Sequence, residues 1–203
     1  MAILILVRHG ESEWNKKGIW TGLTDISLSK EGIKESKQAA DRLLGEKIDI
    51  AYTSVLKRAR ETLDIIKESL NIPNLLVVEN KALNERDYGE LTGKNKWQIM
   101  KQYGDKKFLQ IRRGWDVPIP KGETLKDVYN RVVPYYKKEI LPRLKESKTV
   151  LIVAHGNSLR VLVKYLENIS DADVENLEIA TGEIHVYRVA QNGEIISKEK
   201  RLS

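Results

Sequence analysis

Two of the three histidines in this chain occupy the same sequence setting. His9 follows the apolar run 3–7 and His155 follows the apolar run 151–154, and a glycine comes directly after each histidine. Short, β-branched apolar runs are typical of buried strands, and α/β proteins bind ligands at the carboxyl ends of their strands. A neutral imidazole can act as a base, a nucleophile or a metal ligand near physiological pH. The repeated pattern therefore predicts two functional histidines at one edge of a sheet.

Two arginines could supply positive charge at that edge. Arg8 immediately precedes the first histidine, and its guanidinium is a permanent cation whose donor fork suits phosphate. Gly10, on the other side of that histidine, lets the backbone approach a ligand closely. Arg58 falls in the first turns of a predicted helix, where the helix dipole does not favour a cation. We therefore take Arg58 as a candidate anion ligand, with an ordinary surface arginine as the alternative.

The third histidine, His185, lies in the alternating stretch 184–189. Alternation of apolar and polar residues is typical of a strand with one solvated face. We therefore predict that His185 is an exposed strand residue, and we assign it no functional role.

The composition is that of a globular protein with one core. The chain has 203 residues, of which 41% are hydrophobic and 32% charged, so one domain spanning residues 1–203 is expected. No apolar run approaches membrane-spanning length, and no basic segment leads into a cleavage site at the amino terminus. Cysteine is absent, which excludes disulfides and thiolate chemistry and favours a cytoplasmic location without a membrane partner.

The net charge is +6 and the sequence pI is about 9.3. Lysine and arginine are scattered along amphipathic segments, and this is typical of a solvated surface. No nucleic-acid recognition motif accompanies the charge, so we expect no nucleic-acid partner. A small anionic substrate fits the same charge, provided that particular arginines converge on one site.

Strand and helix patterns alternate along the chain. The expected strands are residues 3–7, 48–52, 75–79, 151–154, 184–190 and 195–198. The expected helices are residues 29–44, 56–70, 97–103, 105–113, 124–144 and a helix from residue 158. This order predicts an α/β fold, a three-layer α/β/α arrangement with a mainly parallel central sheet.

Several residues fix details of these elements. Ser29 is a plausible N-cap for the first long helix, and Ile33 and Leu44 are expected on its buried face. Pro134 should kink the helix 124–144 because proline lacks the backbone N–H. The Asn-Gly pair at 192–193 predicts a hairpin between the last two strands. The segment 83–96 is unusually rich in ionisable side chains for a connector, which indicates a functional loop.

The chain resembles the histidine phosphatase superfamily and, within it, the cofactor-dependent phosphoglycerate mutases. The superfamily resemblance rests on Arg8-His9-Gly10-Glu11, on Thr53-Ser54 with Arg58-Ala59, and on His155-Gly156. Further blocks resemble the mutases along nearly the whole chain: Leu83-Asn84-Glu85-Arg86, Tyr88-Gly89, Asn95-Lys96, Tyr103-Gly104, Arg112-Arg113-Gly114 and Ala154-His155-Gly156-Asn157-Ser158-Leu159-Arg160. The resemblance implies a phosphoglycerate mutase-like fold.

The resemblance also implies a set of catalytic roles. His9 would be the nucleophile that becomes phosphorylated. Arg8, Arg58 and His155 would hold the transferred phosphoryl group. Glu85 would donate and accept the proton of the reacting hydroxyl, provided that burial favours its neutral form.

A second set of residues would contact the substrate. These positions, as the resemblance implies them, are Ser12, Asn15, Thr21, Gly22, Tyr88, Lys96, Arg112, Arg113, Gly156 and Asn157. The implied reaction is the glycolytic and gluconeogenic interconversion of 3-phosphoglycerate and 2-phosphoglycerate. The implied cofactor is 2,3-bisphosphoglycerate, which primes the enzyme by phosphorylating the histidine, and no metal is implied. The sequence leaves a homodimer open.

Three alternatives remain at this point. The loop 116–121 is shorter than in many of these mutases and the chain stops at Ser203, so the pocket is expected to be poorly covered. Water could then compete for the phosphohistidine, and a phosphatase acting on small phosphomonoesters is the second hypothesis. A metal-dependent hydrolase is disfavoured because no close-spaced ligand cluster accompanies either histidine. A basic binding protein without enzymatic activity is the last hypothesis.

Overall fold

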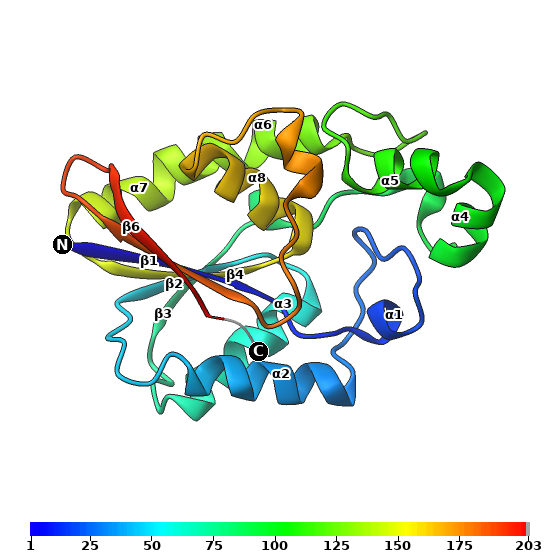
Figure 1. Ribbon diagram of the computed structural model, residues 1–203. Helices are drawn as coiled ribbons and strands as arrows, with labels where there is room; N and C mark the ends of the chain where they lie inside the picture. Colours follow the sequence, from blue (N-terminus) through cyan, green and yellow to red (C-terminus); the bar gives the residue numbers. More distant parts are fainter. Residues whose placement is uncertain (202–203) are drawn as a thin grey trace.

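A six-stranded mixed β-sheet forms the centre of the fold (Figure 1). The computed structural model describes residues 1–201, so the chain end at Ser203 lies outside the described residues. The strands are β1 (Ala2–Arg8), β2 (Ile50–Thr53), β3 (Leu76–Glu79), β4 (Thr149–Ala154), β5 (Ile184–Val189) and β6 (Ile195–Arg201). Their order is β3-β2-β4-β1-β5-β6. Strands β1 to β4 pair in parallel, and β5 and β6 add antiparallel strands at one edge.

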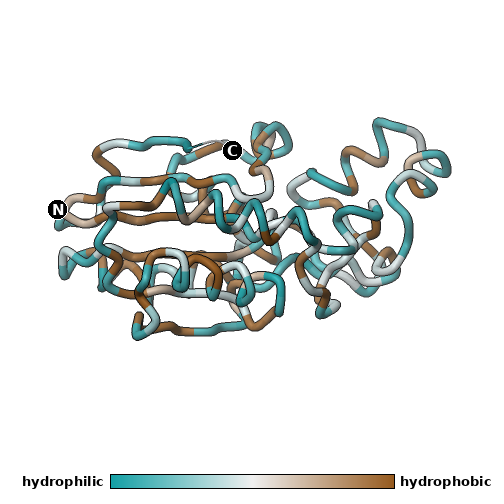
Figure 2. The backbone as a smooth tube through the Cα atoms, turned by 90° about the horizontal axis from the view of Figure 1, so that it is seen from below, coloured by the Kyte–Doolittle hydropathy of each residue, from teal (hydrophilic) through white to brown (hydrophobic). Residues whose placement is uncertain are grey.

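Helices cover both faces of this sheet (Figure 1). One face carries α6 (Leu125–Tyr135), the π-helical turn η3 (Tyr136–Ile140), α7 (Leu141–Lys145) and α8 (Gly156–Leu166), and the other carries α2 (Lys30–Asp41) and α3 (Lys57–Ser69). Successive residues of β1 point to opposite faces, so Leu4 and Leu6 enter one core while Ile5 and Val7 enter the other. Hydrophobic residues concentrate along the strands in Figure 2. The predicted three-layer fold with a mainly parallel sheet is confirmed.

A third group of elements lies beyond the carboxyl ends of the parallel strands (Figure 1). It contains α1 (Glu13–Lys16), α4 (Lys96–Tyr103), α5 (Asp105–Arg113) and the short 3₁₀ helices η1 (Lys81–Leu83) and η2 (Gly89–Leu91). A separate apolar cluster that includes Trp20, Phe108 and Ile119 packs it together. The last short helix, η4 (Asp173–Asn176), follows α8. These elements build walls around the strand ends.

The predicted helix 124–144 is present but interrupted. Thr124 caps α6, accepting a hydrogen bond from the backbone N–H of Asp127 at 3.1 Å. Pro134 lies inside α6, and the π-helical turn η3 begins two residues later. Proline removes one backbone donor from the helix, and π-turns are a known way in which helices accommodate such a break.

Two predictions about side-chain exposure are wrong. Ser29 does cap α2, accepting from the N–H of Gly32 at 3.1 Å, but Ile33 is 41% exposed. The helix ends at Asp41, so Leu44 lies beyond it and is 67% exposed. The remaining differences are shifts of up to three residues at element ends, where backbone hydrogen bonding decides the boundary.

His185 is buried, contrary to the prediction of an exposed strand residue. Strand β6 pairs along the outer edge of β5, and Arg188 is the only exposed residue of β5. The His185 Nε2 lies 2.6 Å from Glu183 Oε1, and Lys200 from β6 contacts the same carboxylate at 2.8 Å. Alternation alone did not indicate that this strand is covered by a neighbour.

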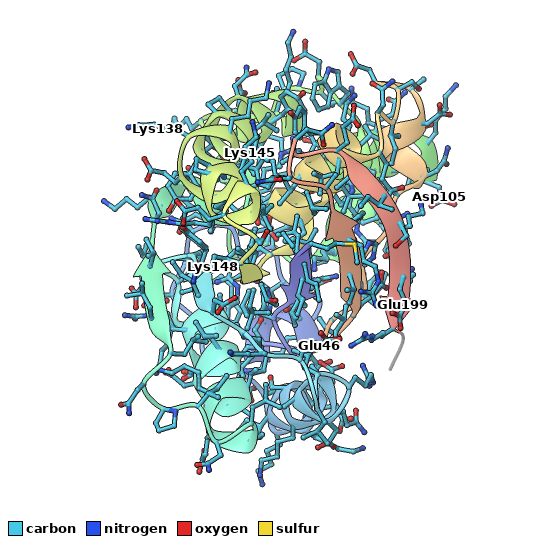
Figure 3. All side chains as sticks on the ribbon, turned by 90° about the vertical axis from the view of Figure 1, so that its left-hand side faces the viewer. Glu46, Asp105, Lys138, Lys145, Lys148 and Glu199 are labelled. Atoms are coloured by element: carbon cyan, nitrogen blue, oxygen red, sulfur yellow. The ribbon has the colours of Figure 1, made fainter. Side chains whose placement is uncertain are left out.

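Charged side chains project on all sides of the end of the molecule at which β1 begins (Figure 3). The acidic residues Glu46 and Glu199 appear in the same view as Lys138, Lys145 and Lys148. This mixture agrees with the expectation of a solvated, scattered positive charge. Among residues 1–201, no helix is both long and apolar enough to cross a membrane.

The chain leaves β1 through a tight backbone contact that fixes the position of residue 9. The N–H of His9 donates to the carbonyl of Ala154 at 3.0 Å, and the N–H of Gly10 donates to Thr62 Oγ1 at 3.1 Å. A Cβ on Gly10 would lie 2.2 Å from the carbonyl oxygen of Gly32 in α2. Only glycine therefore permits this approach of the β1 exit to the first turn of α2.

We predict that Gly10→Ala lowers the free energy of unfolding by about 1–3 kcal/mol, the range typical of overpacking against fixed backbone. Gly156→Ala is the matched control, because its Cβ would meet its nearest neighbours at an ordinary 3.5–3.7 Å. The control should cost less than about 1 kcal/mol, since alanine also favours the helix. Urea unfolding of both variants measures the difference, and equal stabilities would contradict the contact.

Candidate active site

A polar pocket opens at the carboxyl ends of β1 and β4. All but two of the residues predicted for the site line it, and the two exceptions are Ser12 and His155. The lining residues from the prediction are Arg8, His9, Asn15, Thr21, Gly22, Arg58, Glu85, Tyr88, Lys96, Arg112, Arg113, Gly156 and Asn157. Residues separated by up to about 150 positions in sequence are thus brought to one cleft.

His9 is held as a neutral imidazole in one tautomer. Its Nδ1 lies 2.6 Å from the carbonyl oxygen of Gly10, so Nδ1 carries the proton and donates it. The Nε2 therefore presents its lone pair, which receives a hydrogen bond from Arg58 Nε at 3.3 Å. Burial, followed by the charges of Arg58 and Arg8, lowers the pKa of His9 well below its ordinary value. A neutral ring whose Nε2 carries the lone pair is suited to nucleophilic attack.

His155 lies directly behind His9, with the two ring centroids 4.9 Å apart in an edge-on arrangement. The Oγ of Ser54 accepts the N–H of Leu56 at 3.1 Å and lies 2.7 Å from His155 Nε2. The serine hydroxyl is then free to donate to Nε2, which places the imidazole proton on Nδ1. Burial and the neighbouring charge of Arg58 lower the pKa of His155 well below its ordinary value. This ring is a neutral hydrogen-bond donor.

Backbone carbonyls orient the two arginines of this end of the pocket. Arg8 Nη1 donates to the carbonyl of Ile179 at 2.5 Å, and Arg58 donates to the carbonyls of Thr24 and Gly22 at 2.9 Å each. Burial lowers the pKa of Arg58 to about 10, so the side chain remains charged at neutral pH. Arg8 Nε and His155 Nδ1 are among the buried donors that have no hydrogen-bond partner within residues 1–201. Unpaired buried donors of this kind fit an anionic ligand.

Glu85 presents one free oxygen to the same space. Its Oε1 accepts hydrogen bonds from the backbone N–H groups of Arg86 and Asn157 at 2.7 and 3.2 Å, and from Asn157 Nδ2 at 3.0 Å. Within the described part of the chain, Oε2 accepts none. The position that a Cβ would take on Gly156 is 3.7 Å from this Oε2 and 3.5 Å from Arg8 Nε. The free carboxylate oxygen can therefore exchange a proton with a ligand that lies over the glycine.

Cations also line the far side of the pocket. The Lys96 Nζ lies 5.8 Å from the centre of the Trp20 ring. Burial, assisted by the charges of Arg112 and Arg8, lowers the pKa of Lys96 to about 8. Arg113 Nη2 lies 2.5 Å from one carboxylate oxygen of Glu178, and Arg112 Nη2 lies 3.7 Å from the other. This side of the pocket suits a second anionic group of a ligand.

Ser12 is buried and caps α1. Its Oγ accepts the N–H of Asn15 at 3.2 Å and donates to Asn15 Oδ1 at 2.9 Å. It thus positions Asn15, which lines the pocket. A direct substrate contact by Ser12 stays a prediction.

Sequence reasoning missed Trp20, Arg160 and Glu178, which also line the pocket. Arg160 is buried and donates to Asn157 Oδ1 at 2.9 Å and to the carbonyls of Leu177 and Arg113 at 2.8 and 2.9 Å. An arginine inside the apolar run of α8 was a usable signal for a buried polar role. The sequence carried no comparable signal for Glu178.

Among residues 1–201, no group of three or more His, Cys, Asp or Glu side chains is placed to hold a metal ion.

The two buried histidines predict a loss of stability in mild acid. Each has a pKa of about 6.5 in an unfolded chain, whereas the folded pKa lies well below that value. The unfolded state therefore binds more protons as the pH falls through 6.5, and stability is lost. Each histidine contributes a slope of up to about 1.4 kcal/mol per pH unit, or about 2.7 for the pair.

Denaturant unfolding between pH 7.5 and 5 measures this slope. The double variant His9→Gln/His155→Gln should lose most of it over the same range, because glutamine does not titrate. If the double variant keeps the slope of the parent protein, then other groups cause the acid sensitivity.

Comparisons with known proteins agree with this geometry. The family model described as histidine phosphatase superfamily (branch 1) matches residues 4–200. A protein of Parvibaculum lavamentivorans named 2,3-bisphosphoglycerate-dependent phosphoglycerate mutase is 47% identical over 97% of this chain and 95% of its own length. A Schizosaccharomyces pombe protein named phosphoglycerate mutase is 46% identical over 97% of this chain and 94% of its own length.

A solved structure has the same architecture. The structure titled Bacillus stearothermophilus YhfR superimposes with a TM-score of 0.84 at 25% identity, covering 96% of this chain and 94% of the other. The family model and the relatives, which match over nearly their full length, agree with a pocket that contains His9 with His155 beside it. The chain belongs to branch 1 of the histidine phosphatase superfamily.

Proposed function

We propose that this protein interconverts 3-phosphoglycerate and 2-phosphoglycerate through a phosphoryl group carried on His9. The observation that carries the proposal is the neutral His9 ring, whose Nε2 is contacted by Arg58 in a pocket that Arg8 also lines. The names of the relatives with 46–47% identity, which describe phosphoglycerate mutases, support the same reaction.

In the first step, the lone pair of His9 Nε2 forms a bond to phosphorus while the phosphorus–oxygen ester bond breaks. Negative charge on the equatorial oxygens must be stabilised by fixed hydrogen-bond donors. In phosphoryl transfer, this stabilisation makes the largest contribution to lowering the activation barrier. Arg8 Nε and His155 Nδ1 are two buried donors close to His9 that have no other partner in the described chain. Arg58, held by two carbonyls, adds a second permanent charge.

Glu85 handles the proton in both directions. Its Oε2 gives a proton to the oxygen that leaves phosphorus, and takes one from the hydroxyl that later attacks the phosphohistidine. Oε1 stays engaged by Asn157 and the backbone of Arg86, so the carboxylate keeps one orientation throughout. The free hydroxyl of bound 3-phosphoglycerate takes the phosphoryl group from His9, and transfer of the phosphoryl group from the 3-position back to His9 Nε2 then leaves 2-phosphoglycerate.

The donor set also fits 2,3-bisphosphoglycerate, the cofactor that the sequence resemblance implies. Arg8, Arg58 and the two histidines would hold one phosphate, while Lys96, Arg112 and Arg113 would hold the groups at the other end of the molecule. When bound, this cofactor supplies the phosphoryl group that primes His9. Lys96 and the paired arginines would likewise bind the carboxylate of phosphoglycerate.

The remaining lining residues would position the glycerate. These are Asn15, Thr21, Gly22, Tyr88, Gly156 and Asn157, with Ser12 acting at least through Asn15. We also propose that residues 1–203 form one catalytic domain that acts in the cytoplasm.

The proposal predicts a covalent phosphoryl group on His9. Protein incubated with ³²P-labelled 2,3-bisphosphoglycerate and then denatured should carry acid-labile, alkali-stable label at this residue. His9→Ala should carry none, because no other residue offers an activated nucleophile at this position. His185→Gln is the matched control, since it removes a histidine that does not line the pocket. Label that persists in His9→Ala, or that maps to another residue, would contradict the proposal.

A further inference from the structure

We propose that Glu178 determines specificity in this pocket, as a fixed counter-anion that competes with the second anionic group of a ligand for Arg112 and Arg113. The inference rests on the proposed function, which places the carboxylate or second phosphate of the substrate at these two arginines. It extends that function by naming the residue that sets how much negative charge the far side of the pocket accepts.

Glu178 lies in the pocket wall because both of its neighbours are tied down. The carbonyl of Leu177 accepts a hydrogen bond from Arg160 Nε at 2.8 Å, and the carbonyl of Ile179 accepts one from Arg8 Nη1 at 2.5 Å. Arg160 is buried, Arg8 is half-buried, and both line the same pocket. The backbone of Glu178 is therefore fixed from both sides by residues of the site, and its carboxylate is placed where the two arginines meet.

The carboxylate of Glu178 is an anion at neutral pH. Partial burial acts to raise its pKa, but the hydrogen bond from Arg113 and the charges of Arg113 and Arg112 outweigh it and lower the pKa. The contacts of 2.5 Å to Arg113 and 3.7 Å to Arg112 engage the same guanidinium groups that face the pocket. A ligand anion bound there must share these donors with Glu178 or replace it.

The competition should depend on the charge of the ligand's far group. Coulomb repulsion from Glu178 is proportional to that charge, so a phosphate with about two negative charges is opposed more than a carboxylate with one. A phosphate ester with a neutral tail places its charge only at Arg8, Arg58 and the histidines. Its affinity should depend on Glu178 much less than that of a ligand with a second anionic group.

The test compares dissociation constants in Glu178→Gln and in its parent. Both carry His9→Gln, so that no phosphoryl transfer occurs during calorimetric titration at constant ionic strength. The ligands are 3-phosphoglycerate, 2,3-bisphosphoglycerate and phenyl phosphate. Glu175→Gln is the matched control, because Glu175 lies three residues earlier and makes no ion pair within residues 1–201.

Glu178 is partly exposed and its ion pairs are screened, so the effect should be moderate. We expect Glu178→Gln to lower the dissociation constant for 3-phosphoglycerate by about 3- to 10-fold. It should lower the dissociation constant for 2,3-bisphosphoglycerate by at least the same factor, and it should change that for phenyl phosphate by less than about twofold. Glu175→Gln should leave all three dissociation constants unchanged.

Three results would overturn the inference while leaving the proposed function intact. They are unchanged or weaker binding of 3-phosphoglycerate in Glu178→Gln, equal tightening of phenyl phosphate, and a smaller effect on 2,3-bisphosphoglycerate than on 3-phosphoglycerate. Absence of 3-phosphoglycerate binding to the parent and the variant alike would overturn the proposed function, and the inference with it.

Discussion

Burial of guanidinium groups against backbone carbonyls is the constraint on which this site depends. Removing a charge from water is unfavourable unless hydrogen bonds replace the lost solvent. Arg58 and Arg8 meet this requirement with the carbonyls of Thr24, Gly22 and Ile179. Arginine cannot escape by losing its proton at neutral pH, so the positive charge stays in place. Burial of His9, together with the charges of these arginines, lowers its pKa and keeps the ring neutral, so that Nε2 retains the lone pair needed for attack.

Hydrogen bonds from buried arginine side chains to backbone carbonyls also fix the loops that surround the strand ends. Arg86 is fully buried and donates to the carbonyls of Ile111 and Val117 at 3.0 and 3.1 Å, which ties the short loop 116–121 to the wall. Arg131 donates to the carbonyl of Glu85 at 2.9 Å and fixes the segment that carries the proposed proton donor. The sequence predicted a poorly covered pocket, partly because this loop is short. In the structure, the segment after α8 also lines the pocket, through residues 177–179.

The general architecture could be predicted from sequence because it depends on local patterns. Apolar runs identify the strands, and strand ends that carry His9 and His155 must meet at one edge of a parallel sheet. The exposure of Ile33 and the burial of His185 depend on which neighbouring elements cover a surface, which local periodicity does not contain. The roles of Arg160 and Glu178 depend on contacts between segments distant in the chain. Family resemblance predicts the reacting residues, but it does not show that the carboxylate of Glu178 pairs with Arg112 and Arg113.

The central claim is that phosphohistidine on His9 returns its phosphoryl group to glycerate and not to water. A glycerate hydroxyl held in line with phosphorus has an effective concentration far above that of a bulk nucleophile. The direct measurement incubates the protein with 3-phosphoglycerate, with and without 2,3-bisphosphoglycerate, and follows 2-phosphoglycerate and free phosphate together. The account predicts 2-phosphoglycerate formation that requires priming and outpaces a slow release of phosphate. Phosphate release that exceeds 2-phosphoglycerate formation at saturating substrate would contradict it and identify a phosphatase.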